Sequence, residues 1–261
     1  MPDTKRHGTQ SIERAVDVVK AVASRGRFGW GLRDLAGRCE LDEGTAHRIL
    51  GCLVRERLVL QRARDRHYLP GPMLYELGLG LPEYATFQAA CRTPLASVSK
   101  RFAGLAFLYL RSDADLVCAG RVGDLVYQGL SMDVGSRRPL LSSAGGVAML
   151  IGLPQDEAEA VVAENVRRLG GPGNASVRAL QRMLARSQAL GYAFNQSETA
   201  RGIHAFGVAV RDPRGMPFAS VTVVATADDL PATRGAEVAA ELRRAAQRVE
   251  QGAKRLFDRT A

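Results

Sequence analysis

Long apolar runs are missing from this sequence of 261 residues. No stretch approaches the ~20 consecutive apolar residues that a membrane-spanning helix needs. The polar start, MPDTKRHGTQS, also lacks the apolar core of a signal peptide. We therefore expect a cytoplasmic protein with no membrane partner.

Residue types that bind metal ions or form disulfides are few and scattered. The four cysteines and four histidines lie far apart, and there is no CxxC pair. Structural zinc sites and disulfide frameworks need such residues at close, regular spacing. The sequence therefore predicts no metal site, no disulfide framework and no cofactor. Cys39 and Cys52 fall on predicted helix stripes, where we expect them to be small core residues.

Enzyme motifs are largely absent as well. Gly170 to Gly173 is not followed by the Lys-Ser/Thr pair of a phosphate-binding loop, which argues against nucleotide hydrolysis. Residues 129–133 lack the second glycine of the GxSxG nucleophile elbow. A hydrolase that uses Ser142 or Ser143 with His204 stays open, because triads are defined by geometry and not by spacing. Our leading expectation is a protein that is not an enzyme.

Positive charge is what the chain does have in excess. Its formal net charge is +9, and residues 1–70 alone carry 14 Lys or Arg against nine Asp or Glu. Such a balance favours an anionic partner, either nucleic acid or a membrane surface. The length suits two domains of ordinary size, each with its own core.

Residues 32–58 predict two short amphipathic helices joined by a tight turn. Apolar residues recur at helical spacing on both: Leu32, Leu35, Ala36 and Cys39, then Ala46, Ile49, Leu50 and Leu53. Asp42 stands at the expected N-cap of the second helix. The residues left off its buried stripe are small or hydrogen-bonding: Gly44, Thr45, His47, Arg48, Gly51 and Arg55. This pattern is typical of a helix-turn-helix, although ordinary packed helix pairs share it.

The flanking segments favour a winged helix-turn-helix. Val59 to Gln61 and His67 to Leu69 predict two strands of a hairpin. Arg62, Arg64 and Arg66 alternate along its tip, where they could reach phosphates or a minor groove. A preceding helix should bury one face: Ile12, Ala15, Val16, Val19, Val22 and Ala23.

The remaining residues predict a short connecting helix and then an α+β domain. Gly71 to Leu81 should form the connector, and a helix over Tyr84 to Phe102 should be interrupted near Pro94. Six short strands are expected to form an antiparallel sheet, at residues 105–111, 116–122, 126–132, 192–195, 204–211 and 217–225. Helices are expected within residues 140–153, 156–169, 176–190 and 236–257, with Ser176 as an N-cap and Gly191 as a C-terminal glycine. We expect domains at 1–70 and 84–261, joined by a linker helix at 71–83.

Several motifs, in order along the chain, resemble those of IclR-family transcriptional regulators. They are Gln10 to Ala15, Thr45 to Leu50, Tyr68 to Gly71, Ser143 to Leu150, Gly191 to Glu198, and the later Gly202-Ile203 and Val208 to Val210. The resemblance implies an N-terminal winged helix-turn-helix that binds double-stranded operator DNA. It also implies a C-terminal GAF-like domain that binds a small-molecule effector, in a homodimer or homotetramer. We expect the protein to be a repressor rather than an activator.

The resemblance also implies which residues bind. Thr45, His47 and Arg48 would enter the major groove. The other candidate DNA contacts are basic: Lys5, Arg6, Arg33, Arg62, Arg64 and Arg66. The effector pocket would be lined by Leu130, Ser143, Ala144, Gly145, Asn195, Ala205, Thr222 and Val224, and the polar cluster at 195–199 adds Glu198. A hydrogen-bonded loop is the equally simple interpretation of Glu198.

Departures from the family pattern bear on the ligand. Where some relatives hold an acidic residue, a cysteine and serines, this chain has Asn195, Ala205, Thr222 and Val224. The less charged pocket favours an aromatic or other partly apolar effector, such as an aromatic or carboxylic acid. Residues 207–210 read Gly-Val-Ala-Val in place of the usual Ala-Pro-Val. Two alternatives remain: a hydrolase fused to a DNA-binding domain, and a DNA-binding protein whose second domain only oligomerises.

Overall fold

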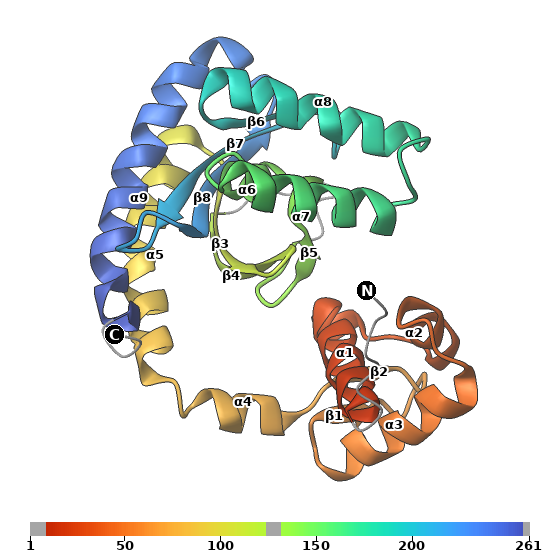
Figure 1. Ribbon diagram of the computed structural model, residues 1–261. Helices are drawn as coiled ribbons and strands as arrows, with labels where there is room; N and C mark the ends of the chain where they lie inside the picture. Colours follow the sequence, from red (N-terminus) through yellow and green to blue (C-terminus); the bar gives the residue numbers. More distant parts are fainter. Residues whose placement is uncertain (1–8, 124–131, 258–261) are drawn as a thin grey trace. The chain divides into compact units, whose positions relative to one another are not determined.

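A computed structural model describes residues 9–123 and 132–257. The chain divides into two compact units, Met1–Pro82 and Glu83–Ala261 (Figure 1). Of the strand predicted at 126–132, only Met132 belongs to the described residues. Within the described part of the chain, no helix is long and apolar enough to cross a membrane.

The first unit is a winged helix-turn-helix, as predicted. Its elements are α1 (Gln10–Ser24), the short 3-10 helix η1 (Gly26–Phe28), α2 (Leu32–Arg38), α3 (Glu43–Arg55), β1 (Val59–Gln61), β2 (Tyr68–Pro70) and α4 (Pro72–Gly78). β1 and β2 pair as an antiparallel hairpin, the wing. Leu35 from α2, Leu50 from α3 and Tyr68 from the wing share one core with the second half of α1. Burying these side chains in a common core stabilises three helices that would each be marginal alone.

Two burial predictions in this unit were wrong. In α1, Ile12 and Val16 are 62% and 45% exposed, whereas Val18 and Val22 are fully buried. The shared core reaches only the C-terminal half of α1, so its N-terminal apolar residues stay uncovered. Cys52 is exposed, whereas Cys39 is partly buried and packs against the core as predicted. Cys52 lies one position before the buried Leu53, and a helix turns by about 100° per residue, which carries the thiol away from the core.

The second unit is built on a six-stranded antiparallel sheet with strand order β5-β4-β3-β8-β7-β6. The strands are β3 (Leu105–Ser112), β4 (Asp115–Val122), β5 (Arg137–Pro139), β6 (Ala193–Gln196), β7 (Ile203–Arg211) and β8 (Pro217–Thr226). The short edge strand β5 was not predicted, because its sequence Arg-Arg-Pro has no apolar alternation.

Helices cover both faces of this sheet (Figure 1). One face packs against α6 (Ala144–Leu150), α7 (Gln155–Arg168) and α8 (Ala175–Leu190). The opposite face packs against α5 (Pro82–Phe102) and α9 (Gly235–Phe257). Successive strand residues point to opposite faces, so each strand contributes to both cores. Short 3-10 turns, η2 (Leu140–Ser142) and η3 (Ala232–Arg234), precede α6 and α9.

Two helix details differ from the sequence prediction. α5 continues through Pro94 without interruption. Apolar residues on either side of the proline, including Phe87 and Phe102, are buried in the same core, and this packing outweighs the ~3 kcal/mol cost of a helical proline. α8 is capped by Asn174 rather than Ser176, because the Asn174 side chain accepts the Ser176 N–H at 2.9 Å. Gly191 does end α8 in the left-handed conformation, at φ 69°.

Candidate nucleic-acid interface and ligand pocket

The start of α3 is fixed by Asp42. Its Oδ1 accepts the Thr45 N–H at 2.8 Å, and this hydrogen bond lowers the pKa of the exposed carboxyl. The opposite side of the helix buries Ala46, Leu50 and Leu53. The cap and the buried face together fix which residues of α3 point outward.

The outward face of α3 carries the predicted groove-reading side chains. His47 and Arg48 are exposed and Thr45 is partly exposed. Arg48 Nη2 donates to Thr45 Oγ1 at 3.1 Å, which holds the guanidinium along the helix. Arg33 is exposed on α2. Lys5 and Arg6 lie outside the described residues.

The wing arginines differ in what they contact. Arg64 and Arg66 are exposed at the tip of the hairpin. Arg62 instead points back into the unit, where it donates to the carbonyl oxygens of Arg27 at 3.0 Å and Phe28 at 3.1 Å. The Arg62 guanidinium is therefore held by the protein, whereas Arg64 and Arg66 are exposed.

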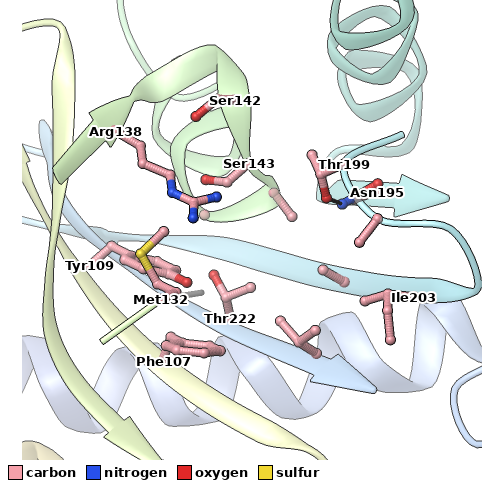
Figure 2. Close-up of a pocket in the computed structure, with 15 residues that line it drawn as sticks. Phe107, Tyr109, Met132, Arg138, Ser142, Ser143, Asn195, Thr199, Ile203 and Thr222 are labelled. Carbon is pink, nitrogen blue, oxygen red and sulfur yellow. Dashed lines mark hydrogen bonds between the residues drawn. The ribbon is translucent and has the colours of Figure 1, made fainter. Parts of the chain in front are cut away.

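A pocket opens between α6 and the sheet of the second unit (Figure 2). Its cavity volume is about 60 Å³. Its lining comes from β3, β5, β6, β7 and β8, the segment before β5, the η2–α6 turn and the loop after β6: Phe107, Tyr109, Met132, Arg138, Ser142, Ser143, Ala144, Gly145, Asn195, Thr199, Ala200, Ile203, Ala205, Thr222 and Val224.

The pocket brings together most of the predicted effector residues. Seven of them line it: Ser143, Ala144, Gly145, Asn195, Ala205, Thr222 and Val224. Leu130 lies outside the described residues. Glu198 is not part of the lining, because its Oε1 pairs with Arg186 at 2.8 Å and its other oxygen accepts the Gln196 N–H. Glu198 thus fits the hydrogen-bonded loop interpretation.

Polar groups inside the pocket are unevenly satisfied. The Thr222 side chain is 1% exposed, and its hydroxyl has no hydrogen-bond partner among the described residues. Burial raises the pKa of Tyr109, so its phenol stays neutral. Asn195 is engaged by its own loop, since Oδ1 accepts the Glu198 N–H at 2.9 Å and the amide donates to Thr199. Among the described lining residues, Arg138 is the one charged side chain, and none is acidic.

Close packing of α6 shapes the pocket floor. A Cβ on Gly145 would lie 2.7 Å from Tyr109 Cε2 and 3.0 Å from Thr222 Oγ1. A Cβ on Gly146 would overlap the carbonyl group of Leu140. Both positions therefore need glycine so that the helix can approach the sheet.

Sequence reasoning missed several lining residues, notably Phe107, Tyr109 and Arg138. The two aromatic rings come from alternate positions of β3 and stack with centroids 5.4 Å apart. Period-two alternation along the predicted strand could have placed both on one face. Arg138 had no such signal, because it lies in the unpredicted strand β5.

The proposed pairing of Ser142 or Ser143 with His204 fails on geometry. His204 is the neighbour of Ile203 and Ala205, which face the pocket, so its ring lies on the opposite face of β7. There its Nδ1 is 2.8 Å from the Leu230 carbonyl oxygen, and the ring packs edge-on against Phe194. A sheet separates His204 from Ser142 and Ser143. Among the described residues, no group of three or more potential metal ligands lies together.

Comparison with known proteins agrees with both units. Residues 11–63 match the family model of the IclR helix-turn-helix domain, and residues 92–251 match that of the bacterial transcriptional regulator IclR C-terminal domain. The glycerol operon regulatory protein of Streptomyces coelicolor is 28% identical over 228 residues, which cover 85% of this chain and 86% of that protein. The transcriptional repressor IclR of Escherichia coli is 23% identical over 247 residues, covering 92% and 88%.

Solved structures share the fold. An IclR-family regulator from Brucella abortus superposes with a TM-score of 0.74 at 18% identity, over 96% of this chain and 95% of that one. An IclR homologue from Microbacterium hydrocarbonoxydans, complexed with 4-hydroxybenzoate, gives 0.67 at 21% identity, over 95% and 100%. The family models together span most of the chain, in the order of its two units. The chain belongs to the IclR family of DNA-binding bacterial transcriptional regulators.

Proposed function

We propose that this protein is an operator-binding repressor whose DNA affinity is set by a small organic acid bound in the pocket of the second unit. The observation that carries the proposal is the buried Thr222 hydroxyl without a partner among the described residues. Leaving such a group unsatisfied costs about 1–3 kcal/mol, which a bound ligand can recover by supplying an acceptor. Arg138 lines the same pocket and would pair with a carboxylate.

An aromatic acid suits the remaining lining best. The stacked rings of Phe107 and Tyr109 offer a flat apolar surface, and Met132 and Ile203 add further apolar area. Aromatic rings prefer such offset-stacked or edge-on neighbours. The 4-hydroxybenzoate bound by the Microbacterium homologue supports an aromatic acid. We assign residues 84–261 to effector binding and oligomerisation, with contacts from Ser143, Ala144, Gly145, Asn195, Ala205 and Val224.

The DNA contacts are assigned to residues 1–70. Thr45, His47 and Arg48 on α3 would read base edges, and Arg33, Arg64 and Arg66 would bind phosphates. The relatives named as repressors support repression. Two-fold pairing of the recognition helices predicts a palindromic operator with half-sites about one helical turn apart.

A homo-oligomer is proposed because the first unit exposes many large apolar side chains. Ile12 and Val16 on α1 are exposed, as are four residues in and after α4: Tyr75, Leu77, Leu79 and Leu81. Clustered apolar exposure of this kind marks an interface. Linker residues 71–83 would then serve both as connector and as dimer contact.

A thermal-shift and DNA-release experiment tests the effector assignment. Aromatic and aliphatic carboxylic acids are compared with their methyl esters, on the wild-type protein and on Arg138→Gln. We expect one or more acids to raise the melting temperature and change DNA affinity by about 5–150-fold, the range of ordinary allosteric coupling. The ester should do neither, and Arg138→Gln should lose the preference for the acid. Equal binding of acid and ester, or binding without any effect on DNA, would refute the proposal.

A further inference from the structure

One arginine fastens the tip of the wing to η1. Arg62 Nη1 and Nη2 donate to the carbonyl oxygens of Arg27 and Phe28 at 3.0 and 3.1 Å. The same guanidinium binds Asp65 in a bidentate manner, with Nε to Oδ1 at 2.9 Å and Nη2 to Oδ2 at 2.7 Å. Asp65 Oδ1 also accepts the His67 N–H at 3.2 Å. We call this arrangement the Arg62–Asp65 clasp.

A backbone connection supports the clasp. Trp30 and Tyr68 exchange two hydrogen bonds, Trp30 N–H to Tyr68 O at 3.0 Å and Tyr68 N–H to Trp30 O at 2.8 Å. Gly29 makes the close approach possible, since its φ is +70° and a Cβ there would lie 2.9 Å from the Tyr68 carbonyl oxygen. Segments more than thirty residues apart in the sequence are therefore fixed side by side.

The clasp joins two segments that are both rich in arginine. Residues 25–30 and 62–67 contain five arginines and one carboxylate, Asp65, which is already bound by Arg62. Arg25 and Arg27 are exposed on the η1 side, and Arg64 and Arg66 on the wing side. The Arg25 guanidinium lies 4.4 Å from the centre of the Trp30 ring and that of Arg27 lies 5.0 Å from that of Phe28. An aromatic face attracts a guanidinium and holds the side chain in place.

We propose that η1 and the wing tip form one DNA-binding surface, on which Arg25 and Arg27 join Arg64 and Arg66 in contacting phosphates of the duplex. Arg62 is a positioning residue and touches no DNA. The inference rests on the proposed DNA-binding role of α3 and the wing. Duplex DNA is the partner that fits, because the two joined segments carry four exposed arginines and one carboxylate, and an excess of positive charge attracts the phosphate backbone.

The clasp makes a prediction opposite to that of plain electrostatics. Asp65→Asn adds one unit of positive charge, so charge alone predicts tighter binding to DNA. If the clasp aligns η1 with the wing, the same variant binds DNA more weakly, since Arg62 loses its bidentate partner. Arg62→Lys keeps the charge but cannot bind Asp65 in the bidentate manner, and it should weaken binding similarly.

The experiment uses the full chain and a labelled duplex of about 30 base pairs, enough for two half-sites one turn apart, selected by this protein from a random pool. Fluorescence anisotropy gives Kd between about 50 and 200 mM salt, and removing one phosphate contact reduces the slope of log K against log salt by ~0.9. Arg25→Gln and Arg27→Gln should each reduce it by about that amount per bound subunit. Arg178→Gln removes an exposed arginine of α8 and should leave it unchanged.

The outcomes separate this inference from the proposed function. Tighter or unchanged binding by Asp65→Asn, with Arg25→Gln and Arg27→Gln matching Arg178→Gln, overturns the surface. If Arg48→Ala weakens binding in the same assay, only this inference fails. If Arg48→Ala also has no effect, the assignment of α3 fails as well. Melting temperatures of all variants show whether weaker DNA binding comes from unfolding. If Asp65→Asn is destabilised, the DNA affinity of Arg62→Lys tests the clasp in its place.

Discussion

Replacing Thr222 by valine should stabilise the unliganded protein. Valine has the shape of threonine, but a methyl group replaces the buried hydroxyl that lacks a partner among the described residues. Removing an unsatisfied hydroxyl recovers about 1–3 kcal/mol, and burying the methyl contributes about 0.8 kcal/mol more. Gly145 and Gly207 lie so close that a Cβ on them would be 3.0 and 3.2 Å from Oγ1, so the larger methyl is crowded. We expect a net gain of about 1–2 kcal/mol after this crowding.

The same substitution should weaken effector binding. A ligand that accepts a hydrogen bond from the Thr222 hydroxyl loses that bond in the variant. The bond is worth about 0.5–1.5 kcal/mol, so Kd should rise by roughly 2–13-fold. Differential scanning calorimetry measures the first effect, expected as a rise of about 2–8 °C for a unit of this size. Titration calorimetry with an acid found in the panel measures the second. Opposite signs for stability and affinity identify a hydroxyl reserved for a ligand.

Ser220 provides the matched control. Its hydroxyl is also buried without a partner among the described residues, and it lies two positions earlier on β8, outside the pocket lining. Ser220→Ala should therefore raise stability and leave effector affinity unchanged. The reasoning is refuted if Thr222→Val melts below the wild-type protein, or if both variants weaken the effector equally.

Three further predictions concern Asn165, Cys52 and Asp42. The buried Asn165 amide accepts the Leu141 N–H at 2.8 Å and donates to the Ala114 carbonyl oxygen at 3.0 Å. Asn165→Ala should therefore lower the free energy of unfolding in urea by about 2–4 kcal/mol and weaken effector binding, and unchanged effector affinity would show that η2 is held by other contacts. A thiol reagent should label the exposed Cys52 first, and bound operator DNA should slow this labelling. Burial raises the pKa of Cys91 and Cys118 to about 12, which keeps both thiols unreactive. Rapid labelling of the Cys52→Ala variant would contradict this. The pKa of Asp42 is lower in the folded protein than the unfolded value near 3.9, so the ionised carboxyl stabilises α3 at higher pH, and this stabilisation is lost as the pH falls through the folded pKa. The Asp42→Asn variant keeps the cap but has no charge, so its melting temperature should depend less on pH below 4. If the variant has the same pH profile as the wild-type protein, the charge of Asp42 is not the cause.

Periodicity predicted most elements of the fold. The helical stripe of α3, the wing and the strands β3, β4, β7 and β8 follow from local spacing, because each needs only neighbours in the sequence. The exceptions involve tertiary contacts. Pro94 stays helical because α5 is packed along its length, and β5 forms by pairing with β4 although its own sequence favours no strand.

The pocket was predicted only in part. Seven lining residues followed from the family resemblance, whereas Phe107, Tyr109 and Arg138 required knowledge of which strand faces α6. Glu198 shows the converse limit, since its neighbour Arg186 lies on α8 and draws the carboxylate away from the pocket. Sequence spacing also gives no sign that Arg62 donates to the carbonyl oxygens of Arg27 and Phe28, which lie thirty-five and thirty-four residues earlier.

Gly145 and Gly146, in the first turn of α6, restrict which substitutions the pocket can accept. Any side chain at Gly145 or Gly146 collides with Tyr109 or with the backbone of Leu140, so this wall of the pocket cannot vary by simple substitution. Ala205 and Val224 line the pocket from strands whose backbone is already held by pairing on both sides. We expect substitutions that change ligand preference among close relatives to occur at Ala205 and Val224, while Gly145 and Gly146 stay unchanged.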